Sequence, residues 1–95
     1  MKIDVSTYSP ERRKAGEDLK NAFNRAAEVG IPAEAFGGGA AVLFPSAQQD
    51  NALRAVQRAV SAAQKHGFEP RVKEAAIIVL DLRDGCRVVP LSCFG

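Results

Sequence analysis

The feature that most constrains the fold is a pair of similar segments, each of which predicts a long capped helix ending at a glycine that an apolar residue follows. The first helix is predicted to begin after Ser9 and to end at Gly30. The second is predicted to begin after Ser46, with Gln49 completing a capping box, and to end at Gly67. Because strand-like segments flank both helices, the chain predicts a split β-α-β arrangement, which specifies an architecture and no chemistry.

Each predicted helix carries a single apolar stripe at helical spacing, with charged side chains on its other side. Such a stripe packs on one face of a sheet, so both helices are expected to cover the same sheet. The stripe residues are Ala15, Leu19, Ala22, Phe23 and Ala26 in the first helix, and Leu53, Val56, Val60 and Ala63 in the second.

The extended segments complete a predicted fold for the whole chain. Alternating or continuous apolar residues predict strands over residues 3–7, 33–36, 40–44, 72–82 and 86–94. Together these elements predict one α+β domain over residues 1–95. Its form is a ferredoxin-like two-layer sandwich, β-α-β-β-α-β, with two helices on one face of an antiparallel sheet and an extra C-terminal hairpin strand. The alternative is that the last hairpin is an arm that pairs between subunits.

The dipeptide Asp84-Gly85 is the strongest hairpin signal in the chain. If it forms the whole loop, Leu80 pairs with Val89, and the set facing the helices is Ala76, Ile78, Leu80, Val89, Leu91 and Cys93. The opposite face is then also largely apolar, which predicts that another protein or a second copy covers it. Its members are Ile77, Val79, Val88 and Pro90, accompanied by Asp81 and Ser92.

Composition excludes several classes of protein. The 13 basic and 11 acidic residues give a net charge of only +2, so nucleic acid is not an expected partner. No apolar run approaches the roughly 20 residues of a membrane span, and the first residues have no apolar signal core, so we expect a cytoplasmic protein. Cys86 and Cys93 are too far apart on one strand for a disulfide and are expected to be reduced.

The candidate sites for chemistry are few. Gly37, Gly38 and Gly39 lead into a predicted strand and not into a helix, which favours a hairpin connector over a phosphate loop, with a weaker reading as the edge of a ligand pocket. His66 is the single histidine and is expected to close the second helix. No metal site or cofactor is predicted. The run Arg12-Arg13-Lys14 is interpreted as solvated residues of a first helical turn, with a small phosphate-binding basic patch as the alternative.

The stretch from Gly38 to Val56 resembles an RNA-recognition motif, with Val42-Leu43-Phe44 followed by an alanine-rich helix. The positions where that family places its base-stacking aromatics carry Gly39 and Ala41 in this chain. The resemblance therefore implies the fold and not RNA binding, because stacking supplies the main affinity for single strands.

Three hypotheses for function follow. The leading one is a non-catalytic protein-interaction module: an adaptor, regulator or inhibitor of a larger protein, of the kind found among phage and mobile-element proteins, acting through the apolar sheet face or by homodimerisation. The second is a regulatory domain that senses a small ligand at a dimer interface. The third is a small enzyme that uses Cys93 or His66 together with Tyr8.

Overall fold

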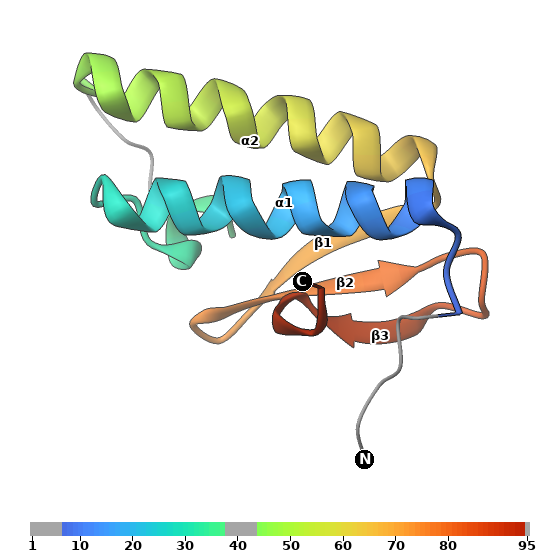
Figure 1. Cartoon of the computed structure of the whole chain (residues 1–95). Helices are drawn as coiled ribbons and strands as arrows, with labels where there is room; N and C mark the ends of the chain where they lie inside the picture. Colours follow the sequence, from blue (N-terminus) through green and yellow to red (C-terminus); the bar gives the residue numbers. More distant parts are fainter. Residues whose placement is uncertain (1–6, 38–43, 95) are drawn as a thin grey trace.

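Two long helices lie side by side on one face of a three-stranded antiparallel sheet in the computed structural model, which describes residues 7–37 and 44–94 (Figure 1). The strands follow one another in the order β1-β2-β3. This part of the chain is therefore an α+β structure. The elements are α1 (Pro10–Glu28), η1 (Ala33–Phe36), α2 (Ala47–Lys65), β1 (Phe68–Lys73), β2 (Ala76–Asp81), β3 (Arg87–Pro90) and η2 (Leu91–Cys93), where η denotes a short 3-10 helix.

The predicted helix ends are confirmed. The Ser9 side chain accepts a hydrogen bond from a backbone N–H of the first turn of α1. Ser46 and Gln49 form a reciprocal capping box, with bonds of 3.0 and 3.1 Å. Gly30 and Gly67 follow the two helices with φ angles of +87° and +81°, a region that glycine enters without steric cost.

The core lies between the helices and the sheet. All five stripe residues of α1 are buried, and the stripe of α2 is buried or packs against the core. Phe68 and Phe94 lie under the helices with their rings 5.7 Å apart. The ring of Phe94 packs directly against the backbone of Gly16, where an added Cβ would lie only 2.2 Å from the ring. Gly16 thus provides the space that this aromatic ring requires.

Several predicted strands are wrong or lie outside the described residues. Residues 33–36 form η1 and not a strand, and the segment predicted as one strand over 72–82 turns back at Glu74-Ala75, so that it contributes to both β1 and β2. Glu74 takes a positive φ of 58° in this turn. The last predicted strand ends at Pro90, because residues 91–93 form η2.

The ferredoxin-like order is not supported, because every strand of the described sheet follows α2. The predicted strands over residues 3–7 and 40–44 lie almost entirely outside the described residues. Their described ends are not in strands: Thr7 lies in a turn, and Phe44 lies in a bend with a φ of 54° and 97% of its surface exposed.

The predicted register of the last hairpin is also wrong by one residue. The turn spans Leu82–Cys86 and not Asp84-Gly85 alone, and Val79 pairs with Val89. The longer turn inverts β2, because a one-residue slip moves every side chain of a strand to the other face. Val79 is consequently fully buried and Ile77 packs against the core, whereas Val89 and Leu91 are buried as predicted.

The predicted interface therefore divides between two faces of the sheet. Ile77 and Val79 face the helices and cannot share an outer surface with Val88 and Pro90. The alternation along β2 places Ile78 and Leu80 beside Val88 and Pro90 instead. These four residues, Ile78, Leu80, Val88 and Pro90, are called the outer apolar face below.

The register can be tested with two identical substitutions. Val79→Asp should lower the free energy of unfolding by more than about 3 kcal/mol, or prevent folding, because it places an unpaired carboxylate in the core. Val88→Asp should change it by less than about 1 kcal/mol, because Val88 is 46% exposed. Urea unfolding followed by circular dichroism measures both values, and equal tolerance of the two variants would contradict the register.

Candidate functional site

Polar side chains from separate segments meet at one end of the two layers. At this end the N-terminus of α1, the C-terminus of α2 and the turn between β2 and β3 come together (Figure 1). Tyr8 precedes α1, Arg12 lies in its first turn, Asp81 ends β2 and Arg87 begins β3. Their side chains are joined by hydrogen bonds, and we call these four residues the polar network.

Asp81 is the centre of the network and is fully buried. Its Oδ1 accepts hydrogen bonds from Arg12 Nη2 at 2.8 Å and from the backbone N–H of Arg83 at 3.1 Å. Its Oδ2 accepts from the Tyr8 hydroxyl at 2.7 Å and from Arg12 Nη1 at 3.4 Å. Four donors thus surround the two carboxylate oxygens, which is what a buried charge requires to be tolerated.

Arg12 connects this carboxylate to the second helix. Only 13% of its side chain is exposed, and its Nε donates to the carbonyl oxygen of His66 at the end of α2, at 3.0 Å. The guanidinium also lies over the rings of Tyr8 and Phe68, 4.7 and 4.2 Å from their centroids. A planar guanidinium suits this position, because it can pair with a carboxylate and stack on aromatic rings at once.

A second arginine, Arg83, also binds the C-terminal end of α2. Arg83 Nη2 donates to the carbonyl oxygen of Lys65 at 3.0 Å, so guanidinium groups occupy two of the carbonyls that α2 leaves unpaired at its C-terminus. The aliphatic part of Arg83 crosses Gly67, where an added Cβ would lie 2.6 Å from Arg83 Cγ. Gly67 is therefore required by its backbone angle and by this close contact.

Tyr8 links Asp81 to Arg87. Its hydroxyl donates to Asp81 and accepts a hydrogen bond from Arg87 Nη2. The Arg87 guanidinium also lies 5.2 Å from the centroid of the Tyr8 ring. Arg87 Nε is buried and makes no hydrogen bond to any described residue, although it lies 3.5 Å from the carboxylate of Asp84.

These contacts shift two acid–base equilibria. Burial by itself would raise the pKa of Asp81, but hydrogen bonds from Arg12 and Tyr8, together with the positive charge of Arg12, outweigh it and hold that pKa below its ordinary value. Burial, with the hydrogen bond to Asp81, raises the pKa of Tyr8 despite the opposing effect of Arg87. The network therefore holds an ionised Asp81 beside a protonated Tyr8 at neutral pH.

The chemistry open to these groups is limited by their mutual contacts. A proton-transfer catalyst needs a free lone pair or proton directed at a substrate. Asp81 already accepts four hydrogen bonds and is sealed from solvent, and the Tyr8 proton is donated to Asp81. The network therefore connects parts of the fold.

The sequence contained a weak signal for this network. Asp81 lies two residues after the buried Val79, so both belong to the same face of β2. A carboxylate on an apolar strand face needs a buried cation. Our interpretation of Arg12 as a solvated residue was wrong, and Asp81, which the predicted register placed on the outer face, is the residue that Arg12 pairs with.

The predicted ligand residues are only partly described. Gly37 ends η1 and lines a groove of about 690 Å³ between α2 and the edge strand β1, whose apolar wall includes Phe36, Val56 and Val72. Gly38 and Gly39 lie outside the described residues. A ligand-binding role for Gly37 stays a prediction.

The groups of the enzyme hypothesis are not joined by hydrogen bonds. Within residues 7–37 and 44–94, the hydrogen bonds of Tyr8 go to Asp81 and Arg87, and none involves the side chain of His66 or Cys93. Cys93 is half-buried against the core and Cys86 is exposed, and both are free thiols. In this same part of the chain, no group of three His, Cys, Asp or Glu side chains is arranged to hold a metal ion.

The remaining findings concern membranes and known proteins. Neither α1 nor α2, the long helices of the described part, is apolar enough over its length to cross a membrane. Comparison of the chain with protein-family models, with curated proteins and with solved structures found no match.

Spectroscopic titration of Tyr8 tests the network directly, because this is the single tyrosine of a chain that has no tryptophan. The phenolate absorbance of the folded protein should rise with a midpoint above pH 10.0, the ordinary value, since the raised pKa opposes ionisation. In denaturant the midpoint should return to about 10. A folded-state midpoint at or below 10.0 would contradict the burial of Tyr8 and its hydrogen bond to Asp81, which together raise this pKa.

Proposed function

We propose that this chain is a non-catalytic protein-interaction module that associates through the outer apolar face. The observation that carries the proposal is the position of Ile78, Leu80, Val88 and Pro90, which alternate with the core-facing Val79 and Val89 and so lie on the opposite face of the sheet. Both helices cover the core-facing side (Figure 1). Val88 is 46% exposed, and Leu82, at the end of the same hairpin, is 50% exposed. Ile78, Leu80 and Pro90 are half-buried. Apolar side chains that remain partly exposed side by side on a small domain are typical of a protein-binding site.

The hydrogen bonds that Asp81, Arg12 and Tyr8 make with one another are the second support for a non-catalytic function. Asp81 and Arg12 bind each other, and Arg12 also binds the carbonyl oxygen of His66 at the end of α2, so these groups stabilise the fold. The carboxylate of Asp81 and the proton of Tyr8 are already engaged with each other. An adaptor, regulator or inhibitor needs a stable scaffold and a contact surface. The proposed compartment is the cytoplasm, where the thiols of Cys86 and Cys93 would stay reduced.

A second copy of the chain is the partner that we propose for this face. Beside it, on β1, Glu69 and Arg71 form an ion pair of 2.9 Å, and Lys73 follows on the same side of the strand. A border with both signs of charge is self-complementary, because a two-fold axis can bring the acid of one copy to a base of the other. Two outer apolar faces would then exclude water from each other.

Light scattering after size-exclusion chromatography tests this proposal. The wild-type chain should convert from monomer to dimer as its concentration rises, and Val88→Asp should stay monomeric while keeping its fold, because it places a carboxylate on the contact surface. Ala62→Asp, at an exposed position of α2, adds the same charge and should dimerise like the wild type. A wild-type monomer at all concentrations, or an undiminished Val88→Asp dimer, would contradict dimerisation through this face.

The groove lined by Gly37 favours a second candidate function. Apolar walls and rim side chains such as Gln57, Gln64 and Arg71 fit a small ligand with one polar end, as a ligand-sensing regulatory domain would require. A thermal-shift screen with amino acids and nucleotides would support this function if one of them raised the melting temperature, and a screen without any shift would count against it.

A further inference from the structure

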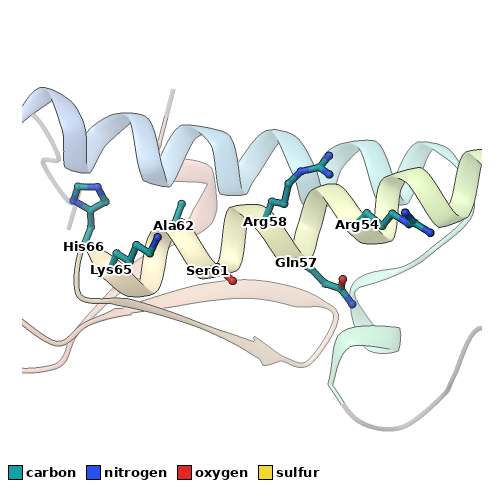
Figure 2. Close-up of a pocket in the computed structure, with 7 residues that line it drawn as sticks. All are labelled: Arg54, Gln57, Arg58, Ser61, Ala62, Lys65 and His66. Carbon is teal, nitrogen blue, oxygen red and sulfur yellow. The ribbon is translucent and has the colours of Figure 1, made fainter.

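The exposed side of α2 carries a row of basic residues. Arg54, Arg58 and Lys65 project from this helix around a shallow depression of about 480 Å³, together with His66 (Figure 2). The other side chains that line it are uncharged, and Gln57 and Ser61 are among them. We call Arg54, Arg58 and Lys65 the basic row.

The spacing of the basic row matches one side of a helix. Arg54 and Arg58 are one turn apart, which is about 6 Å along the axis, and Lys65 lies about 10 Å beyond Arg58. The same separations occur between side chains on any other α-helix. A partner helix lying along α2 can therefore place a carboxylate beside each base without distortion.

The positive charge of the basic row is only partly neutralised by neighbouring carboxylates. Arg54 pairs with Asp50 one turn earlier, at 3.1 Å. Among residues 7–37 and 44–94, Arg58 and Lys65 have no carboxylate partner. The guanidinium of Arg83 adds to the positive charge at the Lys65 end, where it binds the Lys65 carbonyl oxygen.

We propose that this side of α2 binds an acidic helical segment of a partner protein. Charge complementarity selects the partner: carboxylates at one-turn spacing would meet Arg58 and Lys65, and Gln57 and Ser61 can donate hydrogen bonds between them. The inference shares with the proposed function only the idea that the chain binds proteins. Its surface is formed by α2 and not by the sheet, so each can fail without the other.

A nucleic acid fits this surface less well. Its backbone would extend past the narrow row onto the neighbouring helix α1, whose charges are of both signs, with Lys14 paired to Asp18 and Arg25 paired to Glu28. Such a surface gives a phosphate backbone no continuous basic track. A partner helix needs only the bases of α2, which is why the acidic helix is the occupant that we propose.

Fluorescence anisotropy with a labelled helical peptide, bearing glutamate at every fourth residue, tests the proposal. The full chain should bind this probe saturably at low salt, and Arg58→Glu with Lys65→Glu should weaken binding about tenfold. The matched control, Arg13→Glu with Lys14→Glu, makes the same charge change on α1 and should weaken binding less than about twofold. Circular dichroism confirms that both variants fold, since all four positions are exposed.

Two further probes complete the experiment. A peptide of the same composition, kept from forming a helix by proline, should bind more weakly than the helical probe. Val88→Asp should leave probe binding unchanged, which separates this inference from dimerisation through the outer apolar face. The inference is overturned if the two charge-reversal variants lose binding equally, if the non-helical peptide binds as well, or if single-stranded oligothymidylate binds more tightly than the helical peptide.

Discussion

The ion pair between the buried Asp81 and Arg12 is the interaction on which the arrangement of helices and strands depends. It joins the end of β2 to the first turn of α1, and Arg12 Nε also binds the carbonyl oxygen of His66, the residue that follows α2. Removing one partner from such a buried pair typically costs about 3–5 kcal/mol, because the other charge remains without solvent. Tyr8 adds a further donor, and the aromatic rings beneath exclude water. The two helices therefore have a fixed position relative to the sheet at this end.

The helices could be predicted from the sequence because the forces that define them are local. Ser9 and Ser46 cap backbone groups within one turn, and each helix ends at a glycine with positive φ. Which side chains of β2 lie toward the helices could not be predicted in this way. One of its side-chain sets is wholly apolar, and the other is apolar except for Asp81, so the pattern favoured the wrong face for the core. The register depended on a turn three residues longer than Asp84-Gly85. The turn at Glu74-Ala75 was missed because it contains no glycine or asparagine.

The polar network escaped prediction for a different reason. Tyr8 and Asp81 are 73 positions apart in the sequence, and Arg12 and Asp81 are 69 apart. No local sequence motif therefore predicts these contacts. The inversion of β2 is what turns Asp81 inward, and the same inversion brings Ile78 and Leu80 to the outer apolar face. The structural network and the proposed contact surface thus follow from one choice of register. The basic row on α2 is independent of that choice, because it depends on helical spacing alone.

The most direct test of this account is an NMR titration of the Asp81 side-chain carboxyl carbon in the folded protein. The donors around the carboxylate predict a midpoint below 3.8, the ordinary value. Because the folded-state pKa is depressed, Asp81 stabilises the fold above its unfolded-state pKa, and this contribution is lost as the pH falls through the folded-state value. A midpoint at or above 3.8 would contradict the account, because burial would then outweigh the bonds from Arg12 and Tyr8.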